Sequence, residues 1–151
     1  MNYTIGKYCI IEDDTLIGEN VIIGDYVKVM NGSIIGDDVI IGDYSRITGP
    51  CKILKGANIR ARTTIAPGFV IGKNTFIGGS VTTTRSNKIK PDSSQPIKHS
   101  LIGNNCKIGS NVTIVSGADI CDDVEIGAGA VVIKPITEPG LYVGNPARKI
   151  R

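Results

Sequence analysis

The chain has a single histidine, His99, which lies in a polar segment rich in cations. Because an imidazole titrates near neutral pH, His99 is the one histidine that can take a proton from a reacting group. The cations Arg85, Lys88, Lys90 and Lys98 crowd the same segment. They could contact an anionic ligand, but a run of charge is also typical of a solvated loop, so both alternatives stay open.

An aliphatic residue recurs at every sixth position over two long stretches of the chain, in nineteen sextets. The next residue is glycine in ten of the nineteen, and a small or branched residue stands four positions after the aliphatic in nearly all of them. A helix repeats its apolar face every 3.6 residues and a strand every two, so a period of six indicates a unit of one short strand and one corner. The aliphatic positions are Ile5, Ile11, Ile17, Ile23, Val29, Ile35, Ile41, Ile47, Ile53, Ile59, Ile65, Ile71, Ile77, Ile102, Ile108, Ile114, Ile120, Ile126 and Val132.

Three such sides close a triangular coil, and coils stack as parallel strands about 4.8 Å apart. The sequence therefore predicts an all-β protein, a single parallel β-helix domain over residues 1–151, with about six triangular coils around a column of Ile. Residues 137–151 follow as a short C-terminal tail. The end of the stack near Met1 to Ile5 has no obvious cap, so we expect the thin prism to associate with copies of itself.

The six-residue frame is lost once, between Ile77 and Ile102, which are 25 residues apart. Residues 83–101 are polar and contain two prolines, so we predict one extruded loop there. In the alternative, Ile97 to Leu101 form a shortened side of the coil, the loop covers residues 83–96, and His99 lies at a corner. The sequence does not separate the two.

Composition excludes several classes of function. The net charge of +3 is far from the charge density of a nucleic-acid binder. One histidine excludes a three-histidine zinc site of the carbonic anhydrase kind, and the cysteines have neither metal-site nor disulfide spacing. Cys9, Cys51 and Cys106 occupy the small inward position and Cys121 the glycine position, so we expect them to fill the core. Without a charged-then-apolar leader or an apolar run of eighteen residues, we expect a cytoplasmic protein with no membrane insertion.

The sextets resemble those of the hexapeptide-repeat acyltransferases, whose pattern builds a left-handed parallel β-helix, and the resemblance covers essentially the whole chain. The left hand comes from this resemblance, since the ordinary crossover preference favours the right. The C-terminal third is similar to the sugar O- and N-acetyltransferases of that superfamily. The motifs that carry this resemblance are Ile102-Gly103-Asn104-Asn105, Ile108-Gly109-Ser110-Asn111-Val112-Thr113-Ile114, Ile126-Gly127-Ala128-Gly129-Ala130-Val131-Val132 and Gly144-Asn145-Pro146-Ala147-Arg148.

The resemblance implies a homotrimer that moves an acetyl group from acetyl-CoA to a hydroxyl or amine of a sugar, possibly nucleotide-linked, for surface polysaccharide synthesis. In such enzymes the pantetheine arm lies in a groove between two subunits, against backbone amides near the corners. Carried over to this chain, the cofactor-binding residues are Ser110, Ser116, Gly117, Ala128 and Gly129, with Lys134, Arg148 and Lys149 near the phosphates. Small residues let a ligand approach the backbone, and cations pair with phosphate oxygens. Glycine at position 129 could instead serve only the geometry of the coil.

By the same resemblance, His99 is the expected catalytic base for a hydroxyl acceptor. An amine acceptor loses its proton with less help from a general base, and in that case His99 would be only a corner or surface residue. Relatives that act on nucleotide-linked amino sugars typically carry a Thr-Asn-Asp run where this chain has Thr84-Arg85-Ser86-Asn87. We assign Arg85 and Asn87 to the acceptor and leave open whether it offers nitrogen or oxygen.

A non-enzymatic β-helix used for assembly is the alternative function, because a fold does not determine a function. The signature that ends at Arg148 argues against it, since a scaffold needs no phosphate-facing tail. The expected partners are thus acetyl-CoA, a small sugar acceptor and two further copies of the chain, with no metal and no nucleic acid.

Overall fold

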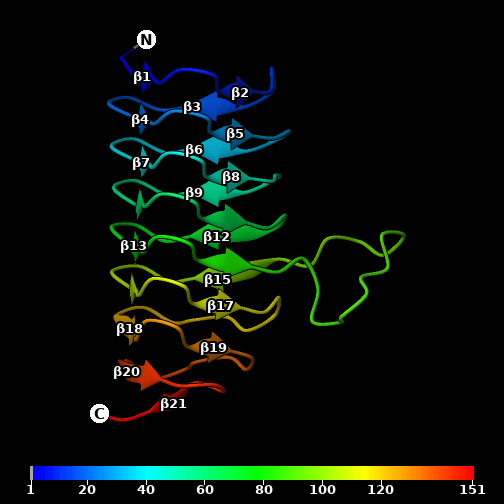
Figure 1. Cartoon of the computed structure of the whole chain (residues 1–151), viewed down its shortest axis with the longest axis vertical. Coiled ribbons are helices and arrows are strands. Elements are labelled where there is room, and N and C mark those ends of the chain that lie inside the picture. Colours follow the sequence, from blue (N-terminus) through cyan, green and yellow to red (C-terminus); the bar gives the residue numbers. More distant parts are fainter. Residues whose placement is uncertain (1) are drawn as a thin grey trace.

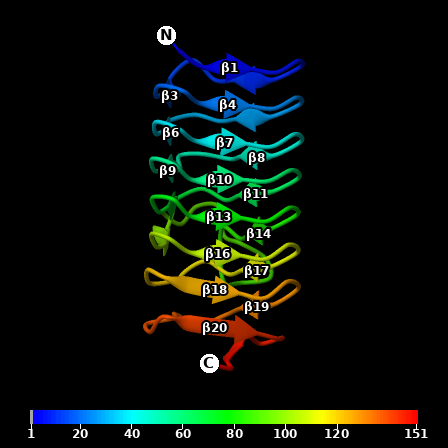
Figure 2. The same ribbon diagram turned by 90° about the vertical axis from the view of Figure 1, so that its left-hand side faces the viewer.

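The computed structural model describes residues 2–151, so the open end predicted for Met1 to Ile5 is seen from Asn2 onward, and Met1 lies outside the described part. Strands joined by turns make up this part of the chain; it has no helix, and hence none that could cross a membrane. The strands stack into a slim column with the two termini at opposite ends (Figure 1). The same stacking is seen along the neighbouring side (Figure 2), and the predicted all-β parallel β-helix is confirmed.

Successive strands join three parallel sheets in turn. Sheet 1 contains β1 (Thr4–Ile5), β4 (Ile22–Ile23), β7 (Ile40–Ile41), β10 (Asn58–Ile59), β13 (Phe76–Ile77), β16 (Lys107–Ile108), β18 (Val124–Ile126), β20 (Gly140–Val143) and, antiparallel to β20, β21 (Arg148–Lys149). Sheet 2 contains β2 (Ile10–Ile11), β5 (Lys28–Val29), β8 (Arg46–Ile47), β11 (Thr64–Ile65), β14 (Thr82–Thr83), β17 (Thr113–Ile114) and β19 (Val131–Val132). Sheet 3 contains β3 (Leu16–Ile17), β6 (Ile34–Ile35), β9 (Lys52–Ile53), β12 (Phe69–Ile71) and β15 (Ser100–Ile102), and bridges at Ile120 and Ile136 continue it.

Eight parallel strands stack in sheet 1, so the column has about eight turns, and the predicted number of about six was too low. Three sides of the coils were not counted from the sequence, because they do not carry Ile or Val at the six-residue spacing. Thr83 takes the inward position on β14, Ile136 comes only four residues after Val132, and Tyr142 stacks on Ile126 from β20. Within residues 137–151, therefore, β20 adds a further strand to the column.

The aliphatic ladder forms one continuous core. From Ile23 to Val132 its members are at most 3% exposed, whereas Ile5 at the open end is 37% exposed. Equivalent residues of successive coils pair directly, as Ile41 does with Ile59. Each fully buried Ile contributes about 1.5 to 3 kcal/mol through the burial of apolar surface.

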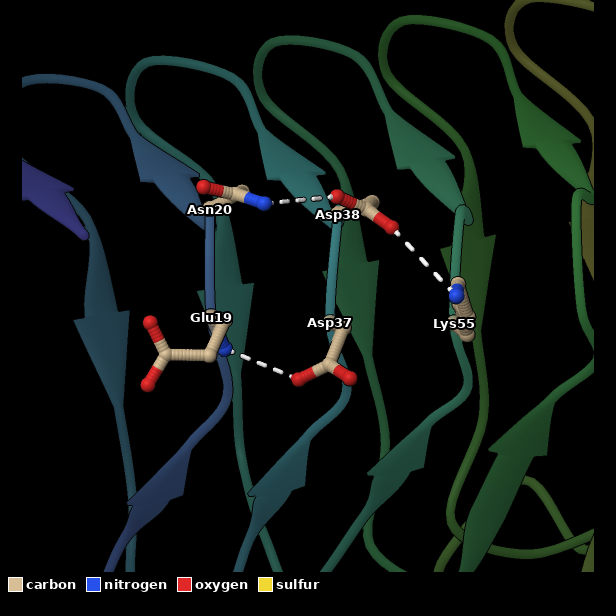
Figure 3. Close-up of polar contacts among 5 residues, drawn as sticks. All are labelled: Glu19, Asn20, Asp37, Asp38 and Lys55. Atoms are coloured by element: carbon tan, nitrogen blue, oxygen red, sulfur yellow. Dashed lines mark hydrogen bonds and ion pairs between the residues drawn. The ribbon is translucent and has the colours of Figure 1, made fainter. Parts of the chain in front are cut away.

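Polar side chains at the turns bind the coil that precedes them. Asp37 Oδ1 accepts a hydrogen bond from Glu19 N at 2.8 Å, and Asp38 Oδ1 accepts one from Asn20 Nδ2 at 3.3 Å (Figure 3). Lys55 of the following coil places Nζ 3.8 Å from the other carboxylate oxygen of Asp38. Three successive coils are thus linked outside the core as well as inside it.

The same contacts explain the glycine that follows many ladder residues. Asp122 Oδ1 accepts a hydrogen bond from Asn104 N at 2.7 Å and therefore passes over Gly103, where a Cβ would lie 2.6 Å from this oxygen. Asp25, Asp37 and Asp43 lie in the same way across Gly6, Gly18 and Gly24. At these four positions, glycine leaves room for the carboxylate of the next coil. The glycine of one coil and the Asp of the next thus form one contact between coils.

The chain leaves the column once, after β14, and projects from it as one long loop (Figure 1). This confirms the prediction of a single extruded loop between Ile77 and Ile102. Before β15 begins, the chain has already returned to the column, because the Ile97 side chain and the Lys98 carbonyl lie against Gly68. A Cβ on Gly68 would approach both within 2.6 Å. His99 therefore lies at a corner, as in the alternative that treats Ile97 to Leu101 as a shortened side.

The cysteines are free thiols, and two of them fill the core as predicted. Cys51 and Cys106 are buried, whereas Cys9 and Cys121 are partly buried. Burial raises the pKa of the Cys51 thiol to about 11. A neutral, enclosed thiol is a poor nucleophile, so Cys51 serves packing and not chemistry.

Replacing Ile59 by alanine should destabilise the column far more than the same change at Ile22 on the outer face of the same sheet. Ile59 is fully buried, so Ile59→Ala should cost about 2 to 5 kcal/mol of unfolding free energy. Ile22 is 50% exposed, and Ile22→Ala should cost about 1 kcal/mol or less. Urea unfolding followed by circular dichroism measures both, and equal losses would contradict the assignment of the ladder as the core.

Iodoacetamide should alkylate Cys51 in the native protein at least about a hundredfold more slowly at pH 8 than in the urea-unfolded chain, since the rise in its pKa from 9.0 to about 11 depletes the thiolate. The raised pKa favours the neutral thiol, so this protection holds below pH 9 and fades as the pH rises through about 11. Peptide mass spectrometry measures the rates, with the partly buried Cys9 as the internal control. Native rates that match for the two thiols would show that Cys51 is accessible.

Candidate functional site

Three columns of turns run along the prism where neighbouring sheets meet. Edge A joins sheet 1 to sheet 2 and includes residues 109–112 and 127–130. Edge B joins sheet 2 to sheet 3 and includes residues 115–119 and 133–135. Edge C joins sheet 3 to sheet 1. The long loop leaves the column and returns to it at edge B.

Both ends of the loop are tied to the same turn of edge B. Thr84 Oγ1 accepts a hydrogen bond from Ser116 N at 3.1 Å, and Ser100 Oγ accepts one from Gly117 N at 2.9 Å. Ser100 and Ser116 are buried. The loop thus has a fixed root, even though most of its residues are exposed.

His99 lies exposed at this root, next to Ser100. Its neighbour Lys98 reaches across Gly117, where a Cβ would lie 2.9 Å from Lys98 Nζ. Within residues 2–151 no group hydrogen-bonds to the imidazole. The structure therefore brings the predicted base, His99, to the same turn as Ser116 and Gly117, two of the residues predicted to bind the cofactor.

The loop encloses a cavity of about 160 Å³ against this turn. Its lining includes Arg85 and Asn87, which were predicted to bind the acceptor, together with Lys88, Lys98 and Ser116. Arg85 holds the loop closed by donating hydrogen bonds to the carbonyl oxygens of residues 92 and 95, at 3.5 and 3.4 Å. The predicted acceptor residues thus face a real cavity next to Ser116.

Other predicted cofactor residues lie on edge A. Gly129 N donates a hydrogen bond to Ser110 O of the preceding coil at 2.9 Å, and Ala128, which precedes Gly129 in the same turn, is exposed. A Cβ on Gly129 would meet nothing within 4 Å, so the backbone here is open to a ligand. Ser110 also lines a groove of about 500 Å³ that runs along this edge to Gly42.

The three predicted cations lie apart from one another. Lys134 is on edge B, in the coil that follows Ser116. Arg148 comes directly after Ala147, whose N–H donates to Val131 O at 2.8 Å near edge A. Lys149 points away from both, because its Nζ lies 3.1 Å from the carboxylate of Glu138 at edge C.

The predicted site is therefore divided between two edges of one chain. Ser110 lies in a turn of edge A and Ser116 in a turn of edge B, at opposite ends of the side of the prism that contains β17. Sequence reasoning missed Ser100, whose Oγ accepts a hydrogen bond from Gly117 N, and named Lys98 only as one of the loop cations that could contact an anion. Their position directly beside His99 was the available signal. A third groove of about 550 Å³, between Phe76, Ile108 and Leu141 on sheet 1, contains none of the predicted residues.

Comparison with known proteins identifies relatives along the chain. The family model of the bacterial transferase hexapeptide (six repeats) matches residues 14–49 and 99–134. The serine acetyltransferase of Mycobacterium tuberculosis is 33% identical over 109 residues, which cover 70% of this chain and 48% of that protein. The galactoside O-acetyltransferase of Escherichia coli is 36% identical over 93 residues, or 54% of this chain and 42% of that protein. The chain thus spans about half the length of these relatives.

Solved structures share the fold at low sequence identity. The acetyltransferase domain of PglB from Neisseria gonorrhoeae matches 94% of this chain and 54% of that chain, with a TM-score of 0.59 and 20% identity, and it has also been solved in complex with acetyl coenzyme A. The period of six, the matched repeats and the shared solenoid lead to the same assignment. The chain belongs to the hexapeptide-repeat transferase superfamily.

Proposed function

We propose that this chain is an acetyl-CoA-dependent acetyltransferase whose acceptor is a hydroxyl or an amine of a sugar, either free or nucleotide-linked. Its superfamily, its similarity to a galactoside O-acetyltransferase and the acetyl coenzyme A complex of a protein with the same fold support this. The observation that carries the proposal is the position of His99, exposed at the fixed root of the loop and one residue from the Ser100–Gly117 hydrogen bond.

In this mechanism His99 acts as the general base. The imidazole takes the proton of the acceptor hydroxyl while the oxygen attacks the thioester carbon of acetyl-CoA. The carbon–sulfur bond then breaks, and the imidazolium returns the proton to the departing thiolate of CoA. An amine acceptor would need less help in losing its proton, so the dependence on His99 distinguishes the two acceptor types.

The division of the predicted donor residues between edges A and B supports a homotrimer with the donor between copies. Ser110 and Ser116 belong to the same coil, and Gly129 and Lys134 to the next. A rotation about an axis parallel to the column keeps each coil at its own height, so edge A of one copy can face edge B of another at the same level. Lys149 would contribute to phosphate binding only by leaving Glu138.

Purified protein given acetyl-CoA and a hydroxyl sugar acceptor should release the free thiol of CoA, measured with a thiol reagent. His99→Ala should lower kcat at least about a hundredfold, because general base catalysis typically contributes that much. Lys90→Ala, an exposed change on the same loop, should leave the rate within about twofold. No thiol release with any hydroxyl or amino sugar, together with no CoA binding by calorimetry, would contradict the proposal and favour the scaffold alternative.

Two separately inactive variants, His99→Ala and Gly129→Tyr, should restore activity when they are expressed together. Gly129→Tyr should fold, because Tyr8, Tyr26 and Tyr44 occupy the equivalent turn with φ of 60°, 58° and 61°, close to the 73° of Gly129. If each site uses His99 of one copy and Gly129 of another, random mixing leaves about a quarter of the sites intact. Activity that stays at the level of the two parents would instead place both residues of a site on one chain.

A further inference from the structure

We propose that the cavity enclosed by the loop and Ser116 binds a phosphate group of the acceptor. The identity of the ligand as an acceptor rests on the proposed function, whereas the phosphate site itself follows from the charge, shape and contacts of the loop. We call this cavity the loop pocket; its lining includes Arg85, Lys88, Lys98, Asp92 and Ser116.

The loop pocket has an excess of positive charge. Arg85, Lys88 and Lys98 face it, and none of them forms an ion pair within the described residues 2–151. The guanidinium of Arg85 is bound only to two backbone carbonyls, at the long distances of 3.5 and 3.4 Å. Three cations thus line one cavity, and within residues 2–151 none of them forms an ion pair with a carboxylate.

Asp92 is the single acid in the lining, and its carboxylate is already engaged. It accepts hydrogen bonds from the Ser94 hydroxyl at 2.6 Å, from Ser94 N at 3.0 Å and from Gln95 Nε2 at 3.4 Å. These bonds, that of the Ser94 hydroxyl first, lower the pKa of Asp92, so it stays ionised at neutral pH. One negative charge against three positive charges leaves an excess of about two, which matches the charge of −1.5 to −2 on a phosphate monoester at pH 7.

The floor of the loop pocket supplies a neutral donor. Ser116 is only 6% exposed, and it lines this cavity. Asn87 also lines the cavity, and its side-chain amide is a further neutral group that can donate a hydrogen bond. A phosphate offers three strong acceptor oxygens, enough to engage the fork of Arg85 and these neutral donors together.

The loop pocket is large enough for one functional group of a ligand but too small for a complete ligand. Its volume of about 160 Å³ is well below the 300 to 1,000 Å³ of pockets that enclose a complete small molecule. At about 30 Å³ for each water, it holds about five waters. A phosphate fits inside while the sugar that carries it stays outside, close to His99 at the root of the loop.

Inorganic phosphate is the probe that tests the site without relying on activity. Phosphate titrated into the ¹⁵N-labelled full chain at constant ionic strength should give saturable shifts of the amide signals of residues 85–98 and Ser116. Arg85→Gln and Lys98→Gln should each weaken binding at least about tenfold, because each removes a charge-assisted hydrogen bond. Lys90→Gln removes a charge from the same loop without touching the cavity, and should change the affinity less than twofold.

Shifts that do not saturate, or a Lys90→Gln variant that binds phosphate as weakly as Arg85→Gln, would overturn the site, since they would indicate general attraction to a basic loop.

Competition identifies the source of the phosphate. A phosphorylated sugar should displace inorganic phosphate while CoA does not; displacement by CoA alone would assign the pocket to the donor and overturn the acceptor assignment. Phosphate binding without thiol release would instead defeat the proposed function and leave the site standing.

Discussion

Vertical register between coils is the constraint on which the rest of the structure depends. Before the loop, ladder residues stack on the residue eighteen positions away, as Ile59 does on Ile41. Because side chains alternate between the inner and outer faces of a strand, a slip of one residue would turn the whole ladder toward water. Across the loop, Ile71 pairs with Ile102, 31 residues away, so the excursion adds thirteen residues without disturbing the stack. Loop-closure entropy rises slowly with length, which makes such an insertion inexpensive.

A column this regular positions functional groups at the places where the repeat changes. The loop root is rigid because Thr84 and Ser100 use their hydroxyls to bind the next coil, at Ser116 and Gly117. Gly129 leaves the backbone of edge A open where other coils carry a side chain in the same turn. The stacked coils on both sides hold these exceptions in place, so His99 stands at a defined point where the long loop rejoins the column.

The proposed chemistry needs more surface than one chain gathers in one place. Edge A offers open backbone at Gly129, and edge B offers the loop, His99 and the loop pocket. A full side of the prism separates them, and the donor in our proposal bridges two copies for this reason. The acceptor in turn would be held by its phosphate in the loop pocket, with its nucleophile near His99.

Much of the architecture could be read from the sequence, because a six-residue period has one common physical solution. Each Ile in the ladder must be buried, the Gly-Asp pairs must lie at turns, and the break after Ile77 must leave the coil. Local pattern alone sufficed for these, since every coil repeats the same contacts with its neighbours. The number of turns was underestimated because Thr83 and Tyr142 take positions that the pattern assigns to Ile or Val, and because Ile136 departs from the six-residue spacing.

The grouping of the site was decided only in three dimensions. Lys98 lies across Gly117, whereas Lys149 forms an ion pair with Glu138, although both lysines look alike in the sequence. The direction in which a long side chain points depends on the coil beneath it and on the path of the loop, and neither is encoded within a single sextet. The sequence by itself determined the column and its interruption; the tertiary structure decided which residues share an edge, because contacts between residues far apart in the chain arise only when the coils are stacked.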